Sequence, residues 1–246
     1  MDTAIFHFHG DINFFLPKKQ RHHPFEHPFS WKASIKDMVE SLGPPHSEIA
    51  LLLVDGVSVG FDHIVLPHAK IDIYDEQSAV DVDNRVWLRP PLSGKPRFVL
   101  DTHLGRLAGY LRMMGFDTLY RNDYDDDLLA EISDIEGRIL LTRDIGLLKR
   151  GRVQYGYFMR ETNPKKQIIE IVRRYTLSLT TSPFRRCLKC NGELSPVEKA
   201  AVLAQLPNTS AEQYDEFRQC DDCGQVYWKG THYDKMREFL DGVMKG

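Results

Sequence analysis

The segment that decides the fold is FVLDTHLGRLAGYLRMMGFDTLY, residues 98–120. It begins with a short apolar run, Phe98 to Leu100, which ends in Asp101. Apolar residues then recur at the spacing of one helix face: Leu104, Leu107, Leu111 and Met114. Gly115 follows where a helix C-terminal cap is expected, and Phe116 to Tyr120 can extend again. The segment therefore predicts a strand, a helix and a second strand in succession.

The same alternation continues downstream. The expected elements are a helix after Asp125 with Leu128, Leu129 and Ile132, a strand over residues 138–142, a strand over residues 155–159, and a helix from Asn163-Pro164 through Tyr175. Strands that alternate with helices predict a parallel α/β sheet. The carboxyl ends of such strands share one edge, so Asp101 and Asp144 are expected at the same edge.

Clustered aspartates at one sheet edge have a chemical interpretation. Neighbouring carboxylates repel one another unless a cation or proton compensates, and oxygen ligands suit Mg²⁺ or Mn²⁺. A metal held there can activate water for phosphodiester cleavage. The alternative is that Asp101 and Asp144 are turn residues and that Asp125 caps a helix. These residues alone leave both interpretations open.

Longer runs carry a family resemblance. The runs are FVLD (98–101), LGRLA (104–108), LRMMGFDT (111–118), GRILLTRD (137–144) and, further on, WKGTH (228–232). In these runs the chain resembles the Mut-seven C-terminal ribonuclease family, a branch of the PIN-like nucleases, over residues 97 to about 235. The resemblance implies a PIN-like fold, a divalent metal and cleavage of RNA.

The resemblance also implies roles for individual acids. Asp101 and Asp144 match positions that hold Mg²⁺ or Mn²⁺. The middle acid falls within residues 125–127, where Asp125 has the family's Asp-x-x-Leu spacing and Asp126 is the reserve. The expected catalytic residues are thus Asp101, Asp125, Asp126 and Asp144. A fourth family acid has no assigned position, and Asp123 is a candidate.

Basic side chains near these acids are expected to hold the RNA backbone, because phosphate contacts position RNA without reading its sequence. Arg106, Arg112 and Arg143 lie within the matching runs and are the expected substrate-binding residues. Lys149 and Arg150 are interpreted as solvated surface charges.

All four cysteines of the chain form two Cys-x-x-Cys pairs: Cys187 with Cys190, and Cys220 with Cys223. A two-residue gap allows one tight turn to aim both sulfurs at one ion, and four thiolates make the closed tetrahedral set of a structural zinc site. Disulfides are disfavoured in a cytoplasmic chain. A redox dithiol is disfavoured because neither pair opens a helix after a strand. Residues 184–246 are therefore expected to form a zinc ribbon with a C-terminal helix.

An aromatic and basic run, residues 226–233, follows the second cysteine pair. Tyr227, Trp228 and Tyr233 suit stacking on unpaired RNA bases. The alternative, which is the favoured interpretation, is that they pack around the zinc-binding turns.

Residues 1–92 predict a small α+β domain. The expected strands are residues 5–8, the apolar run 12–16, residues 49–54 and residues 71–74, with a helix capped by Ser34 and ended by Gly43. Residues 18–28 are rich in His and Pro and are expected to be a loop. In element order and in its Val-Asp-Gly turn, this segment resembles ubiquitin-like β-grasp domains related to sulfur carriers. It continues into residues 90–96 and has no terminal Gly-Gly, so carrier chemistry is not expected.

The histidines of that loop, His22, His23 and His27, could bind a metal. A surface loop without metal is the favoured interpretation.

The composition sets the remaining limits. The 246 residues are 42% hydrophobic and 27% charged, with a net charge of −3. No apolar run reaches the roughly 20 residues that span a bilayer, and residues 1–3 do not begin a secretory signal, so a cytoplasmic protein without membrane contact is expected. Acidic residues gather over 121–136 and basic residues over 138–174.

The predicted architecture has three domains. They are a β-grasp, ubiquitin-like domain (1–92), a PIN-like α/β domain with a parallel sheet (97–180), and a zinc ribbon (184–246). The predicted function is a ribonuclease with Mg²⁺ or Mn²⁺ at the acids and a structural Zn²⁺, with RNA as partner and a protein partner for the N-terminal domain. The alternatives are a non-catalytic RNA-binding or adaptor protein and, from residues 1–92 alone, a sulfur-transfer adaptor.

Overall fold

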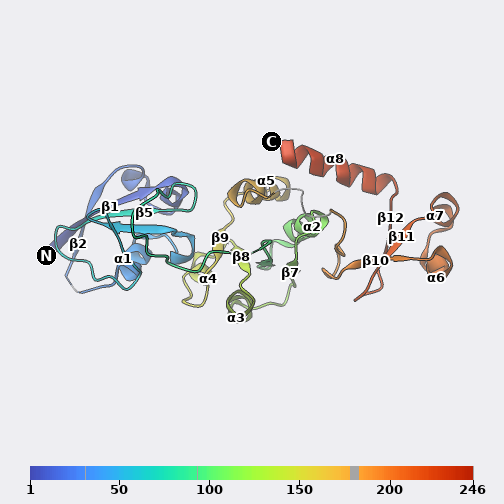
Figure 1. The fold of residues 1–246 in the computed structure, drawn as a ribbon, viewed down its shortest axis with the longest axis horizontal. Coiled ribbons are helices and arrows are strands. Elements are labelled where there is room, and N and C mark those ends of the chain that lie inside the picture. The colour runs from blue at the N-terminus through green and yellow to red at the C-terminus, as the bar shows by residue number, and fades with distance from the viewer. Residues whose placement is uncertain (31, 93, 178–182, 246) are drawn as a thin grey trace. The chain divides into compact units, whose positions relative to one another are not determined.

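The computed structural model of the chain describes residues 1–30, 32–92, 94–177 and 183–245 (Figure 1). The chain divides into two compact units, residues 1–93 with 126–158 and residues 94–125 with 159–246. Each unit therefore contains part of the predicted nuclease domain. The predicted end of that domain, residue 180, lies outside the described residues.

The first unit contains a five-stranded mixed sheet with the strand order β2-β1-β5-β3-β4. Its elements are β1 (Asp2–His9), β2 (Phe25–Phe29), α1 (Ile35–Leu42), β3 (Leu51–Val54), β4 (Val57–Ser58) and β5 (Lys70–Tyr74). β1 and β5 pair in parallel, whereas the other neighbours pair antiparallel. One helix on a mixed sheet of this order is the predicted β-grasp arrangement.

Local sequence explains most of this unit. Alternate residues of β1 face the core, so Ala4, Phe6 and Phe8 are buried. The Ser34 hydroxyl accepts a hydrogen bond from the Asp37 amide at 3.1 Å, which confirms the predicted N-cap. Gly43 ends the same helix at a φ of +133°, as expected.

The prediction of a second strand over residues 12–16 is wrong. Residues Gly10–Phe15 form a 3₁₀ helix, and β2 instead begins within the stretch 18–28 that was predicted to be a loop. The Asn13 side chain donates to the Phe8 and Gly10 carbonyls at 2.7 and 3.0 Å, which holds the turn directly after β1. β2 tolerates Pro28 because it lies at the edge of the sheet.

The first unit also holds α3 (Asp126–Glu136), β8 (Ile139–Thr142), α4 (Ile145–Leu148) and β9 (Gly156–Phe158). β8 and β9 pair in parallel. The β-grasp residues pack directly on this part. The Glu48 carboxylate accepts from the Phe158 amide at 2.6 Å, and the Ser47 hydroxyl donates to the Leu148 carbonyl at 3.2 Å.

The second unit begins with the segment that decides the fold, and the predicted strand, helix and strand are confirmed. Its elements are β6 (Phe98–Leu100), α2 (Gly105–Met113), β7 (Thr118–Tyr120) and α5 (Pro164–Arg174). β6 and β7 pair in parallel, and α2 packs on α5. The Asn163 side chain caps α5, and Leu107 and Leu111 are fully buried on α2.

The cysteine ribbon (residues 184–245) completes the second unit. It contains β10 (Leu194–Val197), α6 (Lys199–Val202), α7 (Asn208–Gln213), β11 (Phe217–Cys220), β12 (Val226–Trp228) and α8 (Thr231–Lys245). The three strands form an antiparallel sheet in the order β10-β11-β12. Across the described ranges, no helix combines the length and apolar character needed to cross a bilayer.

Candidate functional site

The four cysteine sulfurs converge in the ribbon. The Sγ atoms of Cys187 and Cys223 lie 3.6 Å apart and those of Cys190 and Cys220 lie 3.3 Å apart. All four lie within 4.8 Å of one another. These separations exceed the roughly 2.05 Å of a disulfide and approach the roughly 3.8 Å edge of a tetrahedron with 2.3 Å metal–sulfur bonds. The four thiols therefore fit a single tetrahedral ion.

Two similar turns present these sulfurs. The residue after each pair has a left-handed conformation, Asn191 at a φ of +80° and Gly224 at +71°. The Asn191 amide donates to the Cys187 carbonyl at 2.9 Å, and the Gly224 amide donates to the Cys220 carbonyl at 3.0 Å. Each turn is thereby closed by its own backbone before any ion binds.

Cys187 is prepared for the thiolate form. Burial raises its pKa, but hydrogen bonds from the Tyr227 hydroxyl and from the backbone outweigh burial and lower the pKa to about 7. The Tyr227 oxygen lies 3.2 Å from Cys187 Sγ and accepts from the Leu188 amide at 3.1 Å. Of the three aromatic residues considered for RNA stacking, Tyr227 therefore contacts the cysteine cluster, as the favoured packing interpretation predicts.

Arg112 has a structural position, contrary to the prediction that it binds substrate. Its side chain is 3% exposed and donates to the carbonyls of Thr118, Leu188 and Lys189 at 3.0 to 3.1 Å. Burial lowers its pKa, and the negative charge of the cysteine thiolates acts in the opposite direction. Arg112 thus connects β7 to the first cysteine turn and supplies a cation beside the sulfurs.

Asn191 supports the cysteine site and was not predicted from the sequence. Its side-chain oxygen accepts a hydrogen bond from the Thr118 backbone amide at 2.8 Å. Its side-chain nitrogen Nδ2 donates to the Asp117 carboxylate at 2.8 Å. The available signal was its place directly after Cys190, where a left-handed residue is needed and Asn is tolerated. Asn191 thereby fixes the first cysteine turn on β7.

The predicted catalytic aspartates occupy the ends of strands. Asp101 directly follows β6 and its Oδ1 accepts from the Thr102 amide and hydroxyl at 2.5 and 2.9 Å. Asp144 follows β8 after one intervening residue, is exposed, and caps α4 by accepting from the Gly146 and Leu147 amides. Both aspartates therefore accept local hydrogen bonds through Oδ1 at the end of a strand.

The middle acids differ from each other. Asp125 is exposed, whereas Asp126 forms an ion pair with Arg150 at 3.3 Å, and Arg150 also contacts Asp127. Asp123, the candidate fourth acid, pairs with Arg121 at 2.7 Å. Asp101 and Asp125 belong to the second unit, and Asp126 and Asp144 belong to the first.

Two other arginines that were predicted to bind substrate are exposed, and Lys149 forms a hydrogen bond. Arg106 and Arg143 are exposed, and the Arg143 guanidinium lies 5.8 Å from the centre of the Phe158 ring. The Lys149 ammonium donates to the Glu40 carbonyl at 2.5 Å.

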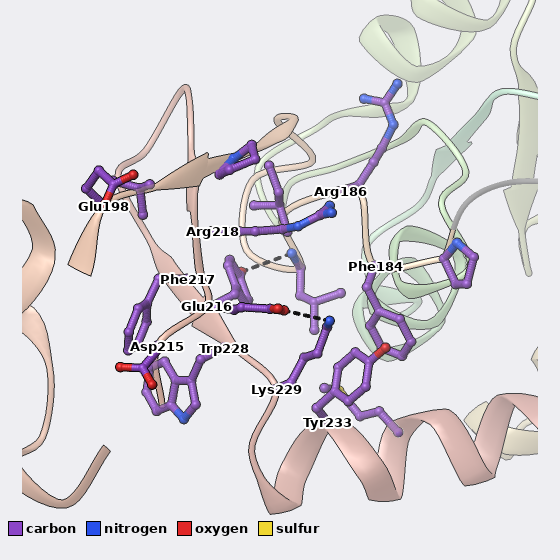
Figure 2. Close-up of a pocket in the computed structure, with 17 residues that line it drawn as sticks. Phe184, Arg186, Glu198, Asp215, Glu216, Phe217, Arg218, Trp228, Lys229 and Tyr233 are labelled. Atoms are coloured by element: carbon purple, nitrogen blue, oxygen red, sulfur yellow. Dashed lines mark hydrogen bonds and ion pairs between the residues drawn. The ribbon is translucent and has the colours of Figure 1, made fainter. Parts of the chain in front are cut away.

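A cavity of about 420 Å³ opens in the cysteine ribbon beside α8 (Figure 2). Its charged lining residues are Arg186, Arg218, Lys229, Glu198, Asp215 and Glu216. The lining thus contains three cations and three anions, and Lys229 pairs with Glu216 at 2.8 Å. The aromatic residues Phe184, Trp228 and Tyr233 also line it, with the Phe184 and Tyr233 rings 4.5 Å apart. The cavity is therefore aromatic and electrically balanced.

Comparison with known proteins agrees with these observations. Residues 96–240 match the family model described as the Mut7-C RNAse domain, and residues 1–81 match the one described as Mut7-C ubiquitin. No curated protein and no solved structure gave a match. The first family model spans more than half of the chain, including β6, α2, β7 and the cysteine ribbon. The chain therefore belongs to the Mut7-C RNAse family and carries its ubiquitin domain at the N-terminus.

Proposed function

We propose that this protein is a metal-dependent ribonuclease. The observation that carries the proposal is the match of residues 96–240 to the Mut7-C RNAse domain. The positions of Asp101 and Asp144 support it, because each follows a parallel strand of a pair, where α/β proteins build their sites.

Asp101, Asp144 and Asp125 would hold Mg²⁺ or Mn²⁺. Asp126 is the second choice for the middle position, because Asp125 has the Asp-x-x-Leu spacing of the family. The bound metal would supply an activated water and charge stabilisation at the phosphodiester. Arg106 and Arg143 would position the RNA backbone through its phosphates.

The test is cleavage of end-labelled single-stranded RNA with Mg²⁺ or Mn²⁺. Asp101→Asn and Asp144→Asn should each lower the rate by about 100-fold or more, the scale on which loss of one electrostatic group acts. Asp134→Asn is the matched control, since this exposed acid lies in the same acidic stretch. Asp125→Asn and Asp126→Asn, compared side by side, identify the middle acid. Equal cleavage by wild type and both strand-end variants would refute the proposal.

The second candidate function is RNA binding without cleavage, and the ribbon cavity favours it. Its balanced charge gives no net attraction for phosphate, whereas its aromatic residues suit an unpaired base. Tyr233→Ala should weaken RNA binding whether the protein cleaves RNA or only binds it. Retained RNA with no cleavage under either metal would select the binding function.

We also propose that the four cysteines bind one structural Zn²⁺. The four converging sulfurs and the neighbouring Arg112 cation support a closed thiolate site. Purified protein should contain one tightly held zinc, and Cys190→Ser should lose it together with the folded ribbon. Unpaired thiols of this kind fit a reducing compartment such as the cytoplasm.

The ubiquitin domain is proposed to bind a protein partner. The family identity of residues 1–81 supports this role.

A further inference from the structure

The ubiquitin domain carries a second cluster of metal-ligating side chains, far along the sequence from the cysteines. The parallel register of β1 and β5 places His7 opposite Asp72 and His9 opposite Tyr74. Because side chains alternate along a strand, the intervening residues enter the core: Phe6, Phe8, Ile71 and Ile73. His7, His9 and Asp72 therefore share the outer face of the sheet.

The distances between the ligand atoms fit one ion. Asp72 Oδ1 lies 2.8 Å from His9 Nε2 and 3.4 Å from His7 Nδ1, and one ligand atom from each residue lies within 4.8 Å of the others. A tetrahedral ion with bonds of about 2.0 to 2.1 Å separates its ligands by roughly 3.3 Å. Small side-chain rotations are enough to convert the present contacts into coordination.

A neighbouring aromatic ring orients one imidazole, and the three side chains remain partly exposed to solvent. The His9 ring stacks on Tyr74 with 4.1 Å between centroids and an interplanar angle of 6°. The side chains of His7, His9 and Asp72 are 30, 26 and 33% exposed, so a fourth ligand can reach an ion from solvent.

We infer that His7, His9 and Asp72 form a binding site for a divalent transition-metal ion of the zinc class. Two imidazole nitrogens and one carboxylate oxygen suit Zn²⁺ better than Mg²⁺ or Ca²⁺, which take oxygen ligands. With three protein ligands and one open position, this site should exchange its ion more readily than the closed four-thiolate site. The inference is independent of the proposed ribonuclease activity.

The sequence alone indicates the two histidines of this site but not the aspartate. His7-Phe8-His9 on a predicted strand puts both imidazoles on one face, but only the pairing of β1 with β5 brings Asp72 beside them. His22, His23 and His27, the histidines considered from sequence, do not belong to either ligand cluster found among the described residues.

The experiment uses the full chain with its cysteine site already loaded with zinc, titrated with further Zn²⁺ by calorimetry. The expected result is one additional ion per chain. His7→Gln, His9→Gln and Asp72→Asn should each weaken this second binding step by more than about tenfold, since even outer-shell changes act on that scale. His63→Gln is the matched control, a half-buried histidine of the same domain outside the cluster.

Two results would overturn the inference. One is the absence of a second binding step in the wild type, which would make the three residues a hydrogen-bonded group only. The other is a second step that all three variants retain. Because the variants alter only outward-facing residues, their thermal unfolding without added metal should match that of the wild type, and this measurement separates lost ligands from lost fold.

Discussion

Gly192 lies so close to the cysteine cluster that a side chain at this position would collide with its neighbours. A Cβ there would lie 2.8 Å from Cys220 Sγ and would also collide with the Asp222 carboxylate. Gly192→Ala should therefore displace a ligand sulfur and weaken zinc binding by about tenfold or more. Competition with a chromophoric chelator measures the affinity. Gly242→Ala is the control, because a Cβ at this exposed position of α8 meets nothing within 4 Å. Equal affinity in both variants would contradict the prediction.

Arg112 links β7 to the first cysteine turn within the second unit. Arg112→Gln removes the cation and leaves carbonyls of Thr118, Leu188 and Lys189 without their donor. Loss of buried hydrogen bonds from a charged group should lower the free energy of unfolding by about 3 kcal/mol. Urea unfolding measures the loss.

Arg106→Gln provides the control on the same helix, since Arg106 is exposed. Its effect on stability should stay within about 0.5 kcal/mol. A similar small effect for Arg112→Gln would show that the buried guanidinium is dispensable to the fold.

At the scale of elements, the end of α1 is connected to the 3₁₀ turn at residues 46–48 by an ion pair. Glu40 Oε1 lies 2.6 Å from His46 Nδ1. Burial raises the pKa of Glu40, but the hydrogen bond and charge of His46 outweigh it, so the pKa falls below its ordinary value of 4.5. The unfolded state then binds more protons than the folded state, and this contribution to stability is present above pH 4.5 and lost as the pH falls through the folded-state pKa.

His46→Gln removes the partner and should therefore destabilise the protein by about 1 kcal/mol at pH 6, with a difference from wild type that shrinks below pH 4.5. Urea unfolding at a series of pH values gives both numbers. Glu26→Gln, at an exposed position of β2, should leave the pH profile unchanged. A wild-type advantage that persists undiminished at pH 3 would argue against this account.

Elements whose signals are local could be predicted, and those that depend on distant residues could not. Phe98 to Tyr120 folds as its periodicity indicates, and Ser34 caps its helix, because the deciding contacts lie within a few residues. The apolar run 12–16 forms no strand because Asn13 fixes a turn there and Asp75, 64 residues from Asp11, accepts from the Asp11 amide at 2.5 Å. No local pattern reveals that contact.

The candidate sites divide in the same way. Cys187, Cys190, Cys220 and Cys223 could be predicted as one cluster because their spacing alone specifies the turns. Arg112 was interpreted as a substrate contact because its burial depends on carbonyls 76 and 77 residues later. The grouping of Asp72 with His7 required the strand register, which the sequence does not specify.

At the scale of the molecule, the ubiquitin domain is part of a larger packed unit. Residues 1–93 and 126–158 form one compact unit, so strands β8 and β9 of the RNAse family domain share it with the β-grasp sheet. Glu48, 1% exposed, bonds the Phe158 amide, and Arg89 donates to the Gln154 carbonyl at 3.1 Å. In both contacts a side chain of residues 1–93 bonds a backbone group of residues 154–158, so the domain should stabilise the nuclease residues directly.

Gly156 tests this connection because its backbone lies directly against Ser47. A Cβ there would lie 2.6 Å from Leu148 Cδ2 and 2.9 Å from the Ser47 hydroxyl. Gly156→Ala should destabilise the protein by about 1 to 3 kcal/mol, the usual cost of overpacking, as measured by urea unfolding. Gly151→Ala, where a Cβ meets nothing within 4 Å, is the control. Adding Ser47→Gly to Gly156→Ala should recover part of the loss, because it removes one of the colliding side chains. If the double variant is no more stable than Gly156→Ala alone, the two domains do not depend on this contact.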